Sequence, residues 1–136
     1  MRVFLDASAM VPLVHRRDQW HASVVRQVRA LQMAGGVDFV TTNWTLYEAF
    51  SVLKRAGHHR CVELARFAED SIATRTVDPV IEEQAVGRFL AWADKTASVV
   101  DHANLLVALE LRCGSLITYD TDFDSIAGGT GIRLLR

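Results

Sequence analysis

Short apolar segments with strand character alternate along this chain with longer segments of helical periodicity. The predicted strands are residues 2–5, 37–41, 74–77, 116–119 and 132–135. The predicted helices are a short one after residue 6 and longer ones at residues 18–34, 43–56, 59–72, 79–94 and 98–113. Such alternation favours right-handed crossovers and a mainly parallel sheet covered by helices on both faces. We therefore expect a three-layer α/β/α sandwich with a central sheet of four to five strands.

Side chains that accept hydrogen bonds from free backbone N–H groups mark where several of these helices begin. Asp18 and Asn43 are predicted to open two of them, and Ser98 or Asp101 is predicted to cap the last long helix. Pro79 suits the first turn of the helix that it begins, because that position needs no N–H donor.

Length and composition indicate one folded unit. The chain has 136 residues, of which 50% are hydrophobic, enough for a single core, so we predict one domain over residues 1–136. Cys61 and Cys113 form no CxxC or Cys/His cluster, which argues against structural zinc and against a disulfide scaffold. No apolar run has the length of a membrane span or of a secretory leader, so we expect a cytoplasmic protein without a membrane partner.

The charge balance does not by itself indicate a nucleic-acid partner. The net charge is −1, from 15 basic and 16 acidic residues, whereas nucleic-acid binders are usually basic overall. Apart from Lys54 and Lys95 the basic residues are arginines, which bind phosphate through two parallel hydrogen bonds. The composition is therefore compatible with RNA binding but does not demonstrate it.

Acidic residues occur where the predicted strands end and where helices begin. Asp6 and Asp120 directly follow predicted strands, at the sheet edge where parallel α/β folds bind their ligands. Asp101 lies at the start of an apolar helix. Glu48 lies within another, beside Leu46 and Phe50, where burying an unpaired carboxylate would be costly without a cation or hydrogen bonds.

Each acid also has an ordinary structural explanation. Asp6 and Asp101 could act as helix caps or first-turn acids, Asp120 and Asp122 could be turn residues, and Glu48 could be a solvated helix residue. Taken together, carboxylates converging from several elements match the oxygen ligands that Mg²⁺ and Mn²⁺ prefer. Without a cation such a group would repel itself. The pattern therefore predicts a site for one or two divalent ions.

Four blocks in order along the chain resemble a known family. The blocks are residues 3–9 (VFLDASA), 42–49 (TNWTLYEA), 98–103 (SVVDHA) and 116–123 (LITYDTDF). They resemble the PIN-domain nucleases, and in particular the VapC-type toxins of toxin–antitoxin pairs. The resemblance covers essentially the whole chain.

The resemblance implies a role for each acid. It implies that four acids are catalytic and bind the metal: Asp6, Glu48, Asp101 and Asp120. Asp122 would be an auxiliary metal ligand. Ser8 and Thr118 would brace the acids through hydrogen bonds.

The function that the resemblance implies is hydrolysis of RNA phosphodiesters with Mg²⁺ or Mn²⁺, inhibiting translation and growth. It further implies a homodimer and a small antitoxin partner that inserts a peptide near the acids. Basic residues near the predicted crevice are candidates for RNA binding, although solvated surface patches would look the same: Arg16, Arg17, Lys54, Arg55 and Arg60. The histidines show no metal-ligand spacing, and His102 should point roughly 100° away from Asp101 on their shared helix.

Two other functions remain open from the sequence. The first is a metal-dependent phosphohydrolase that acts on a small phosphate ester. The second is a PIN module that binds RNA or protein without cleavage, although the intact set of acids argues against it.

Overall fold

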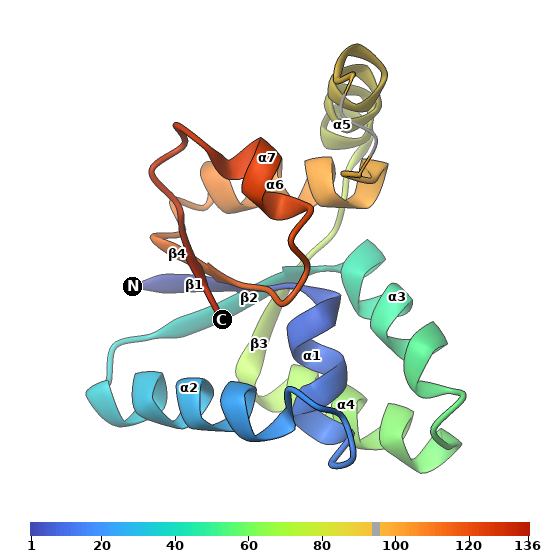
Figure 1. Cartoon of the computed structure of the whole chain (residues 1–136), viewed down its shortest axis with the longest axis vertical. Helices are drawn as coiled ribbons and strands as arrows, with labels where there is room; N and C mark the ends of the chain where they lie inside the picture. Colours follow the sequence, from blue (N-terminus) through green and yellow to red (C-terminus); the bar gives the residue numbers. More distant parts are fainter. Residues whose placement is uncertain (94–95) are drawn as a thin grey trace.

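The computed structural model describes residues 1–93 and 96–136 (Figure 1). The strands are β1 (Arg2–Leu5), β2 (Asp38–Thr42), β3 (Ile72–Arg75), β4 (Ser115–Ile117) and β5 (Arg133–Leu135). The helices are α1 (Ala7–Val14), α2 (His21–Ala34), α3 (Asn43–Leu53), α4 (His58–Ser71), α5 (Pro79–Ala91), α6 (Val99–Glu110) and α7 (Phe123–Ala127). None of the helices within the described residues is both long and apolar enough to cross a membrane.

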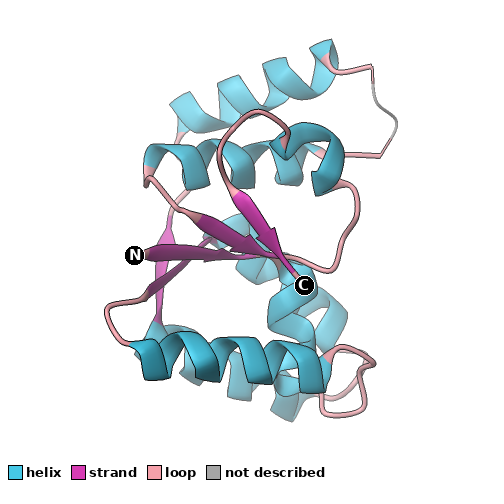
Figure 2. Cartoon of the chain, turned by 60° about the vertical axis from the view of Figure 1, so that its left-hand side comes forward, coloured by secondary structure: helices cyan, strands magenta, loops and turns pink. Residues whose placement is uncertain are grey.

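The strands form one five-stranded parallel sheet in the order β3-β2-β1-β4-β5. Helices α1 to α4 pack on one face, and α5 to α7 lie on the other (Figure 2). The predicted three-layer α/β fold with a parallel sheet is confirmed.

The central strand β1 is buried on both faces. Val3 and Leu5 point into the core shared with α1 to α4, whereas Phe4 points into the core shared with α5 to α7. This two-sided burial explains why the strand is a continuous apolar run rather than an alternating one.

The strand order reverses between β1 and β4. The chain leaves β1 into α1 on one face of the sheet and leaves β4 toward α7 on the other (Figure 1). A crevice opens beyond the carboxyl ends of two strands whose connections diverge in this way. Asp6 follows β1 immediately, and the segment 118–122 follows β4, so the fold brings both to this crevice.

Two predicted helix starts are wrong. Thr42, not Asn43, caps α3 by accepting a hydrogen bond from the Thr45 N–H at 3.1 Å. The Asn43 side chain instead accepts from the Val77 N–H at 2.8 Å, which fixes the segment after β3. Helix α2 begins three residues after Asp18, whose carboxylate closes a turn before the helix.

Several other boundaries also differ from prediction. The strand predicted at 74–77 is Ile72–Arg75, because α4 passes into it without a loop and Ile72 pairs with Phe39. Strand β4 ends at Ile117 rather than at residue 119, so Asp120 lies in the turn that follows. The helix predicted to reach residue 94 ends at Ala91, and Asp94 lies outside the described residues. The short helix α7 was not predicted.

Candidate active site

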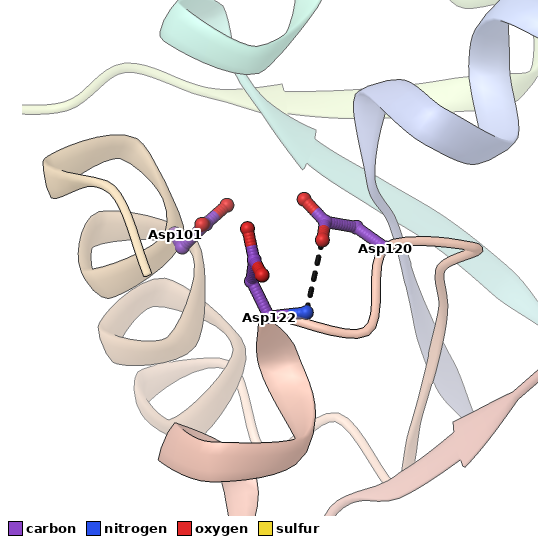
Figure 3. A group of neighbouring side chains, drawn as sticks. All are labelled: Asp101, Asp120 and Asp122. Carbon is purple, nitrogen blue, oxygen red and sulfur yellow. Dashed lines mark hydrogen bonds between the residues drawn. The ribbon is translucent and has the colours of Figure 1, made fainter. Parts of the chain in front are cut away.

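Three carboxylates meet beyond the carboxyl end of β4. Asp101, Asp120 and Asp122 each offer an oxygen that lies within 4.8 Å of the others. Asp101 comes from α6, whereas Asp120 and Asp122 come from the turn that leads into α7 (Figure 3). The Asp122 N–H donates to Asp120 Oδ1 at 2.9 Å and so fixes the orientation of the Asp120 carboxylate.

Asp101 is held by the start of its own helix. Its Oδ2 accepts from the Ser98 N–H at 2.9 Å, and the Ser98 hydroxyl accepts from the Asp101 N–H at 3.1 Å. Ser98 is therefore the cap of α6, and Asp101 completes a capping box. Burial raises the pKa of Asp101 to about 7, with further increases from the charges of Asp6 and Asp120 and an opposing effect of the Ser98 hydrogen bonds.

Asp6 is almost completely buried, with 4% of its surface exposed. Its Oδ2 accepts from the Ser8 hydroxyl at 2.7 Å and from the Thr118 hydroxyl at 3.0 Å, and it also caps α1. Burial raises the pKa of Asp6, and the hydrogen bonds from Ser8 and Thr118 oppose that rise. The two hydroxyls thus connect the end of β1 to the end of β4 and fix the Asp6 carboxylate.

A second set of buried polar groups supports Asp6 from the other side and was not predicted. Asn104 Nδ2 makes a long contact of 3.5 Å to Asp6 Oδ1, and Asn104 Oδ1 accepts from the Thr45 and Thr42 hydroxyls at 2.6 and 3.1 Å. Asn104, Thr42 and Thr45 are fully buried. The available signal was the spacing of Asn104, one helical turn after Asp101 and therefore on the same helix face.

Glu48 is exposed, although its helix is largely apolar. Leu46 and Phe50 turn toward the core, whereas Glu48 faces the pocket that Asp120 also lines. Partial burial raises the pKa of Glu48, and the charges of Asp6 and Asp120 raise it further. Glu48 and Asp6 are thus coupled to the acid cluster through their charges.

The donor set fits a hard divalent cation. Within residues 1–93 and 96–136, the salt bridges found involve none of Asp6, Glu48, Asp101 and Asp120. The pKa values of Asp6, Glu48 and Asp101 are raised, so their charged forms are destabilised in the folded chain. Oxygen donors clustered in this way are what Mg²⁺ or Mn²⁺ would stabilise.

Two cavities lie side by side at this edge of the molecule. One of about 480 Å³ is lined by Ser8, Trp20, Glu48, Tyr119 and Asp120, among others. The other, of about 720 Å³, is lined by basic side chains of the segment after α1, of the segment joining α3 to α4 and of the first turn of α4. Their linings share Val11, Asp18 and Val52, so the acidic and basic cavities are adjacent, and together they are called the groove below.

The basic residues predicted to bind RNA differ in their surroundings. Arg17, Arg55 and Arg60 line the basic cavity. Arg16 and Arg60 are both paired with Glu63, at 3.3 and 3.0 Å. Arg17 and Arg55 have no such carboxylate partner among the described residues. They are therefore the basic groups most available to an anionic ligand.

Lys54 and His102 lie outside this groove. Lys54 Nζ lies 2.9 Å from His58 Nδ1 and does not line the basic cavity. His102 is fully buried and makes edge contacts with Phe89 and Trp92, on the side of α6 that faces α5. These contacts place its ring away from the acid cluster.

Removing the Ser8 hydroxyl should reduce activity without unfolding the chain. In Ser8→Ala the Asp6 carboxylate loses its 2.7 Å hydrogen bond, so its orientation is less well fixed. We expect catalytic rate or metal affinity to fall by roughly 10- to 100-fold, as for other residues that orient metal ligands. Metal titrations by calorimetry and of the reaction rate would measure the effect.

The matched control is Ser51→Ala on the exposed face of α3, where the hydroxyl only donates to the Tyr47 carbonyl. Parental activity in Ser8→Ala, or an equal loss in both variants, would contradict a bracing role for Ser8.

Comparisons with known proteins agree with the observed fold. The family model described as PIN domain matches residues 3–129. The structure superposes on VapC20 of Mycobacterium tuberculosis, a sarcin-ricin loop cleaving toxin, with a TM-score of 0.81 and 25% identity over 96% of this chain and 98% of that one. It also resembles VapBC2 of Rickettsia felis, solved with a promoter DNA fragment, with a TM-score of 0.71 and 10% identity over 99% and 98% of the two chains. No curated protein sequence matches the chain.

Proposed function

The chain belongs to the PIN-domain family, and from this premise we propose that it is a metal-dependent endoribonuclease, the toxin of a toxin–antitoxin pair. The observation that carries the proposal is the cluster of Asp101, Asp120 and Asp122 beside the buried Asp6, beyond the carboxyl ends of β1 and β4. The similarity to VapC20, a toxin that cleaves the sarcin-ricin loop, supports RNA as the substrate and growth inhibition as the outcome.

We assign metal binding to Asp6, Asp101 and Asp120, with Asp122 as an auxiliary ligand and Mg²⁺ or Mn²⁺ as the ion, and we give Glu48, which the resemblance also implies as a ligand, a separate role. The chemistry that such an ion supplies is Lewis acidity, which activates water and stabilises charge on the phosphate and the leaving oxygen. Glu48 is the exposed acid of the set and lines the acidic cavity. Its raised pKa makes it suited to orient the attacking water and to accept its proton.

RNA would follow the groove from the acids to the adjacent basic cavity. Arg17 and Arg55 would bind backbone phosphates, because neither is paired with a carboxylate among the described residues. Arg60 and Arg16 share Glu63 and would contribute less. Lys54, beside His58, would act only at longer range.

The purified chain should cleave RNA in the presence of Mg²⁺ or Mn²⁺, and a chelator should stop the reaction. Cleavage at low RNA concentration should slow by roughly 10-fold between about 50 and 200 mM salt, because the phosphate contacts assigned to Arg17 and Arg55 release counterions. Hydrolysis of a phosphomonoester such as p-nitrophenyl phosphate is the control. Hydrolysis of the monoester but not of RNA would favour a small-ester phosphohydrolase, and RNA binding without cleavage would favour a non-catalytic module.

The antitoxin and the homodimer remain predictions of the family resemblance. An apolar surface suited to a second copy lies on and just after α5, where four large side chains are exposed: Val86, Phe89, Leu90 and Trp92. Helix α5 lies on the outside of its layer (Figure 1).

A further inference from the structure

An aromatic pair borders the acid cluster. The Trp20 indole stacks on the Tyr119 ring, with centroids 4.7 Å apart and planes inclined by 13°. Tyr119 immediately precedes Asp120 in the chain. Both rings line the acidic cavity together with Glu48 and Asp120. The pair is therefore part of the wall that a ligand bound at the acids would meet.

Tyr119, one ring of this pair, is held in place by hydrogen bonds. The Tyr119 hydroxyl donates to Ser23 Oγ at 2.7 Å and accepts from Gln27 Nε2 at 3.0 Å, which ties the ring to α2. The Tyr119 N–H donates to Ser8 Oγ at 2.9 Å, and Ser8 in turn donates to Asp6. The position of the ring is thus coupled to that of the buried acid.

Trp20 rests on this support at the start of α2. The backbone N–H of Trp20 donates to Asp18 Oδ1 at 2.8 Å, and the backbone carbonyl of Trp20 accepts from the Val24 N–H at 2.9 Å. Although Tyr119 covers one face of the indole, Trp20 keeps 41% of its surface exposed. A large aromatic side chain that served only to close the core would be expected to bury more of its surface.

We propose that Trp20 is a stacking platform for an unpaired nucleobase next to the scissile phosphate, an inference that rests on the proposed cleavage of RNA. Every nucleobase has a π-face that stacks on an aromatic ring, so such a platform binds the nucleotide with little dependence on its identity. A base within a continuous duplex keeps its faces covered by its neighbours and cannot use the platform. The nucleotide at the cleavage site is therefore unpaired when it binds.

Kinetics of Trp20 variants on an RNA that the parent cleaves provide the test. Trp20→Ala should raise KM on the order of 10- to 100-fold, the effect of losing one base stack, with a smaller change in kcat. Trp20→Phe keeps a ring and should recover most of the lost affinity. A set of substrates that each carry one abasic nucleotide at a different position near the cut should locate the stacked base. When the abasic nucleotide occupies that position, the parent and Trp20→Ala should have the same KM. A parental KM in Trp20→Ala, or the same loss on every abasic substrate, would overturn the proposal.

A binding measurement separates this inference from the proposed function. Single-stranded oligoadenylate should quench the tryptophan fluorescence of the parent, and the quench should fall sharply in Trp20→Phe. Trp92→Phe is the control, because Trp92 packs against His102 away from the acids. Quenching that depends on Trp20 in a chain that cleaves no RNA would retain the platform and refute the nuclease. Quenching that is unchanged in Trp20→Phe would refute the platform even if RNA is cleaved.

Discussion

Replacing Asp6 by Asn should abolish metal-dependent RNA cleavage and leave the fold intact. The amide keeps an oxygen that can accept from the Ser8 and Thr118 hydroxyls, and Asn caps helices as well as Asp does. What is lost is a buried negative charge that interacts with the cluster of Asp101, Asp120 and Asp122. Since metal assistance contributes several kcal/mol to phosphodiester hydrolysis, the rate should fall on the order of 10³-fold or more.

Glu48→Gln should cause a loss of similar size for a different reason. Glu48 is exposed at the cavity, so its substitution changes no buried packing. The amide cannot accept the proton that we assign to the carboxylate. Cleavage of labelled RNA under single-turnover conditions would measure both variants, and growth on expression would give a second readout.

Two exposed acids of α4 provide matched controls for these substitutions. Asp70→Asn and Glu69→Gln make the same chemical changes on a surface away from the groove and should retain parental rates. Circular dichroism should show that all four variants are folded. If an Asp6→Asn/Asp101→Asn double variant cleaves RNA as fast as the parent, the site proposed here is not the catalytic one.

The sequence located the acids because their positions depend on local pattern. An apolar run followed by Asp6 predicts a buried strand and an acid at its carboxyl end, and the same reasoning applies to Asp120 despite the shorter strand. Ser98 and Asp101 show the spacing of a capping box, although the sequence left open which of them caps. Such features depend on only a few neighbouring residues, so they could be predicted from the sequence.

The residues that the sequence missed depend on neighbours far along the chain. Asn104 contacts Thr42 and Thr45 only because α6 packs beside β2 and α3, at separations of 62 and 59 residues. The stack of Trp20 on Tyr119 requires α2 to lie against the turn after β4. The hydrophobic periodicity of a sequence does not predict such long-range contacts.

Where local propensity and tertiary packing compete, packing decided the outcome. The sequence left open whether Glu48 is buried, and packing exposes it, because its apolar neighbours Leu46 and Phe50 turn to the core. Asn43 was a plausible cap by composition, yet its side-chain oxygen accepts from the Val77 N–H after β3. For Asn43 the residue type suited a cap, but the sequence did not reveal the direction of its side chain.

The second large effect concerns stability: Asp101→Asn should make the metal-free chain more stable at about pH 8. The folded state raises the pKa of Asp101 from 3.8 to about 7, chiefly by burial. Between these values the folded chain holds a proton that the unfolded chain releases, so the free energy of unfolding falls as pH rises. The full shift corresponds to at most roughly 4 kcal/mol, and Asn avoids this cost while keeping an acceptor for the Ser98 N–H.

Thermal unfolding of parent and variant across pH would measure this effect. The difference in Tm should be near zero at about pH 4, grow as pH rises, and level off above about pH 7, reaching on the order of 10 °C. The lowered pKa of His102 acts in both chains, whereas Asp101 interacts with the charges of Asp6 and Asp120, so the difference in Tm measures Asp101 together with this coupling. Mg²⁺ or Mn²⁺ should raise the Tm of the parent at about pH 8 more than that of the variant, since ion binding stabilises only the folded state.

The two arms of this experiment test different statements. A variant that is less stable than the parent at about pH 8 without metal would show that Asp101 is not destabilised by its surroundings. Equal stabilisation of parent and variant by the ion would show that Asp101 is not a ligand. If Asp101 is a metal ligand whose charged form is destabilised in the metal-free chain, Asp101→Asn should both gain stability and lose the response to the metal ion. Such a site lowers the free energy of unfolding of the metal-free chain, and binding of the ion raises it again.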